Sequence, residues 1–441
     1  MQYIYYLFLF TIQVKVSISK LISVIEVNRH GARNAKNFPS EPLQRLFGVN
    51  MKITHNGFRQ HQLLGNYMYD RYINAGFINK EYRADEFEII SSPTQRTLFS
   101  ADGFLTGLFP GYVIKAVYQD PSMNIISDDI IPIPNFPTII KEIPLKVMSW
   151  REKQIFNDPW GCKLNGKKLR KMSVNNTEFP DIFPISREDI IFSARYLREF
   201  FNHSESQNTI IEPETFVNEI KKHSIPYFYH LGVSMEKVLP KKVSDTIKKM
   251  NINNWYNARI RDSKLLKLGP SAFFNLIKRT FNRAIINNTL QKNDKSFPKY
   301  TVFSFHDRAI INLISNILNE KDLQQMIANS INNSNYYNFL VPPFASSLLF
   351  ELHYSQQKQN YYVLRIYNGK VINYPLRNCK QIGTDGKIPI EVFQQFLGNR
   401  IDKDYKHLVC VEKIKDEHNN NNSIAKIQKN QLIVFSNFQL L

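Results

Sequence analysis

The stretch LISVIEVNRHGAR, residues 21–33, joins a largely apolar run to a polar and cationic cluster. The run is rich in β-branched side chains, which is typical of a strand buried on both faces of a parallel sheet. Arg29, His30 and Arg33 follow where this run stops. From Thr54 onward, apolar side chains recur at spacings of three and four residues, the pattern of an amphipathic helix. The stretch therefore predicts a strand, a charged loop and a helix in succession.

The same order of elements returns twice in the chain. The apolar run FEIIS at 87–91 precedes a second helical pattern, and Arg96 stands near its start. The run YTVFSF at 300–305 precedes a third helical pattern, with His306 and Asp307 at the junction. In open α/β sheets, ligands bind outside the carboxyl ends of the strands. We therefore expect the charged residues of all three junctions to meet at one edge of a sheet.

Together the three junctions supply three arginines, two histidines and one aspartate. Taken singly, each group is more often a solvated loop, a surface ion pair or a structural hydrogen bond. Gathered at one edge, so many cations repel one another unless an anion lies between them. The combined pattern therefore favours a site for an anion or a transferring phosphoryl group.

Ordered motifs along the chain resemble those of the histidine acid phosphatases, the larger-insert branch of the histidine phosphatase superfamily. The resemblance covers about residues 20–410 and rests on RHGAR (29–33), THNGFRQHQLLGNYMYDRY (54–72), SSPTQRTLFSADGFLTGLFP (91–110), FSFHDRAI (303–310), PPFASSLLFELHY (342–354) and YYVLRIYNG (361–369). It implies a phosphoglycerate mutase-like α/β fold, with a mainly parallel central sheet flanked by helices. A mostly helical cap subdomain is expected as an insertion at about 120–300 within a domain spanning 19–410.

The resemblance also implies roles for individual residues. His30 is implied as the nucleophile, which attacks phosphorus and forms a phosphohistidine. Asp307 is implied as the proton donor to the leaving oxygen and afterwards as the base for the attacking water. The phosphate is expected to be bound by Arg29, Arg33, Arg96 and His306. Neither a metal ion nor a cofactor is implied, and because the donor must be protonated, turnover should favour acid pH.

Three positions depart from the family pattern and leave the substrate open. Ala35 and Phe305 stand where the family commonly has Pro and Gly, and Arg308 replaces a residue with a hydroxyl group. None of the three is a catalytic group, but each affects loop geometry or substrate fit. The expected partner is a small-molecule phosphomonoester. The alternatives are a phytase or lysophospholipid phosphatase of the same family, and a phosphatase-like binding protein without turnover.

The first sixteen residues are apolar and aromatic, and small polar residues follow them. This pattern indicates a signal peptide over residues 1–18, although the missing positive start leaves a buried first strand as an alternative. No other stretch approaches the length of a membrane helix, so stable membrane insertion is not expected. Asn-x-Ser/Thr sites, which also arise by chance in an Asn-rich chain, occur at Asn175, Asn202, Asn287, Asn332 and Asn421. A secreted protein, or one in the lumen of a lysosome or other acidic vesicle, is expected.

The net charge of +19 on 441 residues raises nucleic acid as a partner. The basic residues are scattered, however, and no nucleic-acid-binding signature accompanies them, so we expect a basic surface that attracts anionic substrates. The three cysteines permit at most one internal disulfide. The family's cysteine placement implies that this bridge joins Cys162 to Cys410. Residues 411–441 are expected to form a polar, low-complexity tail, and a homodimer remains open.

Overall fold

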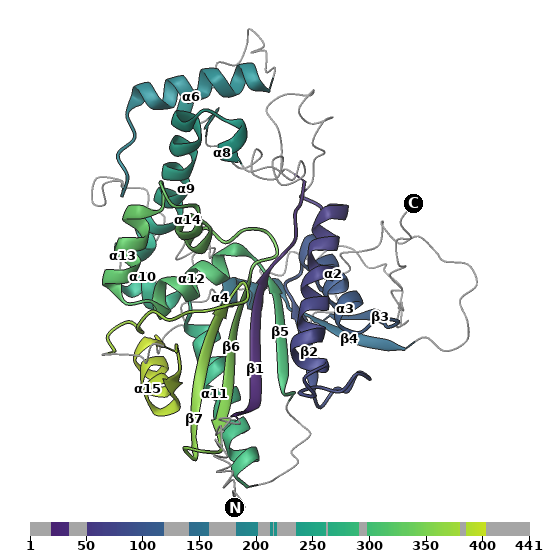
Figure 1. Cartoon of the computed structure of the whole chain (residues 1–441). Helices are drawn as coiled ribbons and strands as arrows, with labels where there is room; N and C mark the ends of the chain where they lie inside the picture. Colours follow the sequence, from purple (N-terminus) through teal and green to yellow (C-terminus); the bar gives the residue numbers. More distant parts are fainter. Residues whose placement is uncertain are drawn as a thin grey trace, which may run out of the picture.

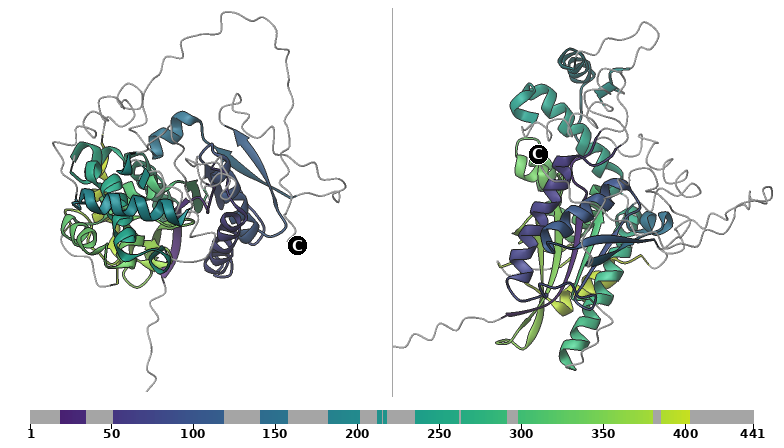
Figure 2. Two further views of the ribbon diagram at one scale, coloured as in Figure 1. Left: turned by 90° about the horizontal axis from the view of Figure 1, so that it is seen from above. Right: turned by 90° about the vertical axis from the view of Figure 1, so that its right-hand side faces the viewer.

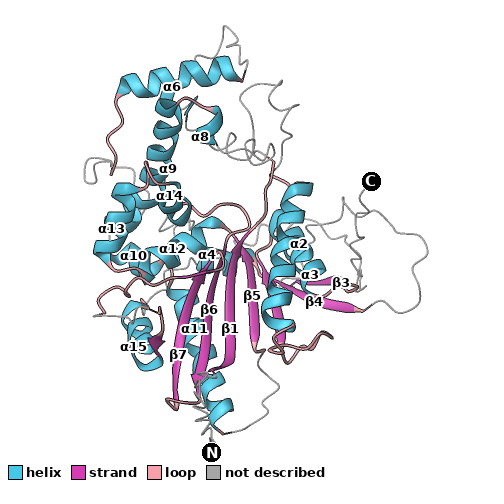
Figure 3. Ribbon diagram, viewed as in Figure 1, coloured by secondary structure: helices cyan, strands magenta, loops and turns pink. Residues whose placement is uncertain are grey.

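The computed structural model of the chain is shown in Figure 1. It describes residues 19–34, 51–118, 141–157, 182–201, 212–214, 216–217, 235–261, 263–290, 298–379 and 385–402. Among these residues, nine strands form one sheet in the order β3-β4-β2-β5-β1-β6-β7-β8, with β9 paired to β7. Helices flank this sheet, so the expected α/β fold is confirmed (Figure 3).

The sheet has a parallel and an antiparallel part. Parallel neighbours are β3 (Val113–Tyr118), β4 (Glu142–Val147), β2 (Phe87–Ser91), β5 (Tyr300–Phe305) and β1 (Ser19–Arg29). The antiparallel strands are β6 (Ser347–Ser355), β7 (Asn360–Tyr367), β8 (Lys370–Val371) and β9 (Ile388–Pro389). The predicted strands at 87–91 and 300–305 coincide with β2 and β5. Every residue of β5 is buried, as expected of a strand covered on both faces.

Helices cover both faces of the sheet, as the two views in Figure 2 show. Alternate residues of β1 point to the two sides, because successive side chains of a strand do so. Val24 joins the apolar cluster under one group of helices, whereas Ile25 and Val27 join the cluster under the other. The first group is α2 (His55–Met68), its π-helical continuation η1 (Tyr69–Ile73) and α3 (Gln95–Leu108). The second group is α4 (Trp150–Asn157), α11 (Ser271–Thr289), α12 (Asp307–Ile317) and α15 (Ile390–Arg400).

Further helices stand above the carboxyl ends of the parallel strands in Figure 1. They are α6 (Arg187–Phe200), α8 (Met235–Val238) and α9 (Lys241–Arg261), with α10 (Ser263–Leu268), α13 (Glu320–Asn329) and α14 (Ser334–Leu340) nearer the sheet. Leu197 of α6 shares a small apolar cluster of its own with Val243 and Ile247 of α9. A separate cluster of this kind lets α6, α8 and α9 form a unit distinct from the two layers on the sheet.

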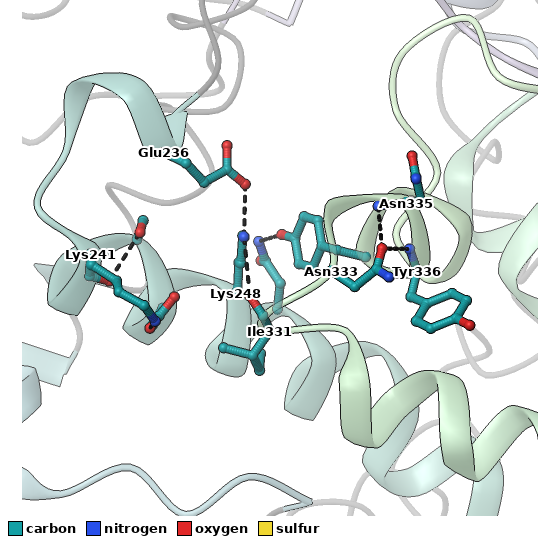
Figure 4. Close-up of polar contacts among 11 residues, drawn as sticks. Glu236, Lys241, Lys248, Ile331, Asn333, Asn335 and Tyr336 are labelled. Carbon is teal, nitrogen blue, oxygen red and sulfur yellow. Dashed lines mark hydrogen bonds and ion pairs between the residues drawn. The ribbon is translucent and has the colours of Figure 1, made fainter.

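The long helix α9 is fixed to the segment around α14 by buried polar contacts (Figure 4). The Lys248 ammonium lies 2.8 Å from the Glu236 carboxylate and donates to the Ile331 carbonyl at 3.3 Å. Asn251 Nδ2 donates to the Tyr337 hydroxyl at 2.8 Å. Buried polar groups need such partners, so these bonds specify how α9 stands over the strand ends.

The range expected for the cap, 120–300, also contains parts of the layered core. Strand β4 lies between β3 and β2 in the sheet. Helix α11 contributes Phe273 and Phe274 to the apolar cluster that also contains residues of β1 and β5. A parallel strand enters a sheet only through a crossover connection, so core and cap segments alternate along this part of the chain.

Several expectations fall outside the described residues. These are the signal peptide at 1–18, the departure at Ala35, the Cys162–Cys410 bridge and the tail at 411–441. Within the described parts of the chain, no helix is long and apolar enough to cross a membrane.

Candidate active site

The three junctions predicted from the sequence lie side by side at the upper edge of the sheet in Figure 1. Arg29, the last residue of β1, is in register with Phe305, the last residue of β5. The amide of His30 donates to the Phe305 carbonyl at 2.9 Å. On the other side of β5, the Ser92 amide donates to the Ser304 carbonyl at 3.1 Å. Backbone hydrogen bonds between neighbouring strands therefore fix the relative positions of these charged residues.

His30 is buried directly beyond the end of β1. Its Nδ1 lies 2.9 Å from the Gly31 carbonyl oxygen, which only accepts hydrogen bonds, so Nδ1 carries the proton. The other ring nitrogen, Nε2, then holds a lone pair. Burial, and after it the charges of Arg96, His306 and Arg29, lower the pKa of His30 well below its usual 6.5. The imidazole is therefore neutral and nucleophilic even in mildly acidic solution.

The charges of all three arginines act on this imidazole. Burial, followed by repulsion from Arg96 and Arg29, lowers the pKa of Arg33 to about 10. Burial also lowers the pKa of Arg96 to about 10; the charge of Asp307 opposes this effect and the charge of Arg29 adds to it. Both side chains stay charged at any physiological pH, yet each is desolvated and repelled by at least one other arginine. An anion bound among them would remove that cost.

His306 and Asp307 come from the end of β5 and the start of α12. His306 Nε2 lies 2.9 Å from the Ser92 hydroxyl, and its ring centroid lies 5.4 Å from that of His30. Burial, with Arg96 as the next cause, lowers the pKa of His306 well below 6.5. The Asp307 carboxylate lies 3.1 Å from the Arg29 guanidinium. The structure thus brings together every described residue that the sequence placed in the site.

Helices α2 and α3 hold the loop that carries His30. The His61 ring donates from Nε2 to the Arg29 carbonyl at 2.9 Å, and the Gly31 amide donates to the Ser100 hydroxyl at 2.9 Å. A Cβ on Gly31 would lie 2.1 Å from the Gly57 carbonyl oxygen, so only glycine permits this approach of loop and helix. The sequence shows His61 on the inner face of a helix but gives no sign of its bond to the loop.

Phe344 is a site residue that sequence reasoning did not identify. Its ring lies 4.2 Å from the Arg29 guanidinium and 5.7 Å from the centroid of His30. Arg29 also donates to the Pro342 carbonyl. The next residue, Ala345, has a φ of +56°, which is uncommon for a residue with a side chain. The motif PPFAS around these residues was a signal, but nothing local assigns Phe344 to the pocket.

Lys153 is a cation near the site that the sequence did not reveal. It lies on α4, which follows β4 at the same edge of the sheet. Burial, together with the charges of Arg96 and Arg308, lowers the pKa of Lys153 to about 7. In the described parts of the chain, no group of three or more histidine, cysteine, aspartate or glutamate residues could hold a metal ion.

The fold and this cation-rich pocket define the class: an α/β protein with a site for an anion at the carboxyl ends of its parallel strands. The sequence profile of the histidine phosphatase superfamily (branch 2) matches residues 44–132. Lysosomal acid phosphatase of Rattus norvegicus is 24% identical over 86% of this chain and 77% of its own length. Prostatic acid phosphatase of Homo sapiens is 23% identical over 91% of this chain and 90% of its own length.

Solved structures show the same fold. The phytase from Citrobacter braakii superposes with a TM-score of 0.54 at 13% identity, covering 89% of this chain and 100% of the phytase. The matched profile and the similarity to acid phosphatases over most of the chain support the histidine acid phosphatase family, within branch 2 of the histidine phosphatase superfamily. The expected family, fold and enzyme class, a phosphomonoester hydrolase, are thereby confirmed.

Proposed function

We propose that this protein is an acid phosphatase that hydrolyses small phosphate monoesters through a phosphohistidine on His30. The observation that carries the proposal is a neutral histidine with a free lone pair at Nε2, within the field of three arginines and close to the carboxyl group of Asp307. A nucleophile must hold its lone pair free, and a phosphate dianion needs fixed positive charge around it. Both requirements are met at the same pH.

In the first half-reaction, Nε2 of His30 attacks phosphorus while the bond to the leaving oxygen breaks. Arg29, Arg33 and Arg96 hold the nonbridging oxygens, and their planar guanidinium groups offer paired N–H donors. His306 adds a further hydrogen bond from its ring. Asp307 gives its proton to the leaving oxygen, so the alcohol departs neutral.

In the second half-reaction, water attacks phosphorus and the bond to His30 breaks. Asp307, now a carboxylate, takes a proton from this water and returns to its starting state. Inorganic phosphate leaves, and the imidazole is again neutral. Arg29 is suited to assist both steps because it contacts Asp307 at 3.1 Å and also faces the phosphate site.

We infer that the protein acts in an acidic lumen or in a secreted fluid. The lowered pKa values of His30 and His306 support this, because both imidazoles stay neutral in mild acid. Relatives named lysosomal and prostatic acid phosphatase also support it. The predicted signal peptide, Cys162–Cys410 bridge, glycosylation and homodimer belong to the same proposal and await their own tests.

The test is release of phosphate from p-nitrophenyl phosphate by the full-length protein at about pH 5, with a chelator present throughout. We expect turnover in the wild type and near-background rates in His30→Ala. If both proteins bind phosphate but neither releases p-nitrophenol, the chain is a phosphatase-like binding protein. Activity on inositol phosphates or lysophospholipid phosphates in preference to simple esters would favour the narrower alternatives.

A further inference from the structure

Two cations that have no part in the proposed reaction lie beside the phosphate pocket: Lys153 on α4 and Arg308 on α12. We propose that they form a second anion subsite, and that the substrate is a phosphate monoester whose leaving group carries another anionic group, a phosphate or a carboxylate. This inference rests on the proposed function and specifies its substrate class. Neither residue belongs to the set that the motifs assign to the reacting phosphoryl group.

The packing of α4 places Lys153 next to the strand ends. The amide of Met148, just after β4, donates to the Ser91 carbonyl at the end of β2 at 2.9 Å. Phe156 lies one turn beyond Lys153 on the same face of the helix, and its ring is 6.3 Å from that of Phe305. Phe305 immediately precedes His306. Lys153 is therefore one helical turn from Phe156, which contacts the last residue of β5.

The surroundings of Lys153 are cationic and aromatic. Its ammonium lies 4.1 Å from the centroid of the Trp150 ring, and among the described residues it forms no ion pair with a carboxylate. The charges of Arg96 and Arg308 act on it, and its own charge acts on His306. A lysine desolvated among cations is unfavourable unless a ligand supplies the missing negative charge.

Arg308 lies on the side of the leaving group. It directly follows Asp307, and its amide donates to Asp307 Oδ1 at 2.9 Å. Its guanidinium lies 5.6 Å from the centroid of Trp255 on α9, so it is held between the proton donor and the cap. Because Asp307 is placed to protonate the leaving oxygen, a group attached to that oxygen would extend toward Arg308 and Lys153.

The alternative is that Lys153 is a further ligand of the phosphoryl group being transferred. The two cases differ in which substrates lose affinity. A ligand of the transferred group affects every phosphate monoester equally, whereas a second subsite affects only esters with a second anion. The matched probes are butyl phosphate and 3-carboxypropyl phosphate, which differ in a terminal methyl or carboxylate. Propane-1,3-diyl bisphosphate probes a second phosphate.

The charge of Lys153 should make this preference depend on pH. The groups that face it are Arg96 of α3, His306 at the end of β5 and Arg308 of α12. With its pKa lowered to about 7, Lys153 is charged at pH 5.5 and largely neutral at pH 8.5. The carboxylate of 3-carboxypropyl phosphate is ionised at both pH values. A weaker preference for this ester at pH 8.5 than at pH 5.5 therefore reports on the protein and not on the substrate.

The test compares kcat/KM for these esters at pH 5.5 in the wild type, Lys153→Gln and Arg308→Thr. The control is Lys115→Gln, because Lys115 lies on the edge strand β3 and pairs with Glu142 of β4. We expect the wild type and the control to favour the ester with the second anion by about tenfold or more, as one charge-assisted hydrogen bond allows. Each pocket variant should lose most of this preference while its rate on butyl phosphate changes less than about threefold.

Equal activity of the wild type on both esters would overturn the inference and leave the proposed function intact. Equal loss on both esters in Lys153→Gln would assign this lysine to the transferred phosphoryl group. Calorimetric binding of the same esters to full-length His30→Ala, with and without Lys153→Gln, measures the preference without turnover. It therefore decides the inference even if no ester is hydrolysed, and thermal denaturation checks that each variant is folded.

Discussion

The Arg29 guanidinium and the Asp307 carboxylate face each other across the ends of two neighbouring strands, with Nη2 and Oδ2 3.1 Å apart. The parallel pairing of β1 with β5 fixes this distance, since Arg29 is in register with Phe305. Arg29 is also held from behind, by the Pro342 carbonyl and by the ring of Phe344. The cation and the carboxyl group that the reaction needs are thus positioned by one piece of sheet.

The first prediction separates the role of Asp307 from those of the arginines. In Asp307→Asn the cations remain, and p-nitrophenolate needs little protonation to depart. Phosphorylation by p-nitrophenyl phosphate should therefore fall much less than phosphorylation by an alkyl phosphate, for which general-acid catalysis typically supplies about 10²–10⁴-fold. Rapid-quench measurement of the first half-reaction on both esters checks this.

The matched control for that experiment is Asp70→Asn, which removes the same charge from an exposed residue at the start of η1. It should leave both rates unchanged. Equal losses on the two esters in Asp307→Asn would show that Asp307 is not the proton donor.

The second prediction concerns the covalent intermediate. Wild-type protein quenched in alkali during turnover should retain phosphate on His30, and Asp307→Asn should retain more, because water attack then lacks its base. His30→Ala should retain none. Mass spectrometry of the peptide that contains residues 29–33 locates the phosphate, and its attachment to any other residue would rule out His30 as the nucleophile.

The strands around the site could be predicted because their signal is local. The runs at 87–91 and 300–305 match β2 and β5 residue for residue. All of β5 is buried, as expected of a strand covered on both faces, whereas only alternate residues of β2 are buried. Strand β4 was not predicted. Only alternate residues of it are buried, and Pro144 interrupts it, so its sequence differs little from that of a loop.

The site was predictable only where a motif marks it. Arg29, His30 and Asp307 stand at strand ends, and the sequence alone shows that position. Phe344 contacts Arg29 and His30, and Lys153 lies near them, because the segment before β6 and α4 pack at this edge of the sheet. Contacts between segments that are distant in the sequence produce no periodic pattern in it. Periodicity shows which face of an element is buried, but not what it is buried against.

The third prediction tests the close approach between the catalytic loop and α2. A Cβ on Gly57 would lie 2.0 Å from the Ala32 carbonyl oxygen. Because both clashing segments are backbone, a side-chain rotation cannot remove the clash. Gly57→Ala should therefore lower the free energy of unfolding by about 2 kcal/mol or more, despite the better helix propensity of alanine. It should also lower kcat/KM by about 10²-fold, because the loop beside His30 must shift.

Gly398→Ala on α15 is the matched control, since a Cβ there meets only the flexible end of Lys278 at 3.4 Å. This variant should be as stable as the wild type or slightly more stable. Urea denaturation and steady-state kinetics on the same samples measure both effects. A Gly57→Ala protein with wild-type stability would contradict the close approach.

The last prediction concerns His61, the buried residue that bonds to the Arg29 carbonyl. Burial lowers the pKa of His61 from 6.5 to about 4, and the bond to Arg29 offsets this only in part. Between these two values the unfolded chain binds a proton at this residue and the folded chain does not. The free energy of unfolding therefore falls as the pH drops from 6.5 to 4, by up to roughly 3 kcal/mol from this residue.

His61→Gln keeps a donor for the Arg29 carbonyl but cannot be protonated in the unfolded chain. At pH 7.5 we expect the variant to be less stable than the wild type, by about 1–2 kcal/mol, because the fit around the bond is imperfect. At pH 4.5 the difference should shrink or reverse sign. His30 and His306 titrate in both proteins, so subtracting the two urea-denaturation curves isolates His61. A difference in stability that stays constant between pH 4.5 and 7.5 would show that His61 does not fold as a neutral, buried imidazole.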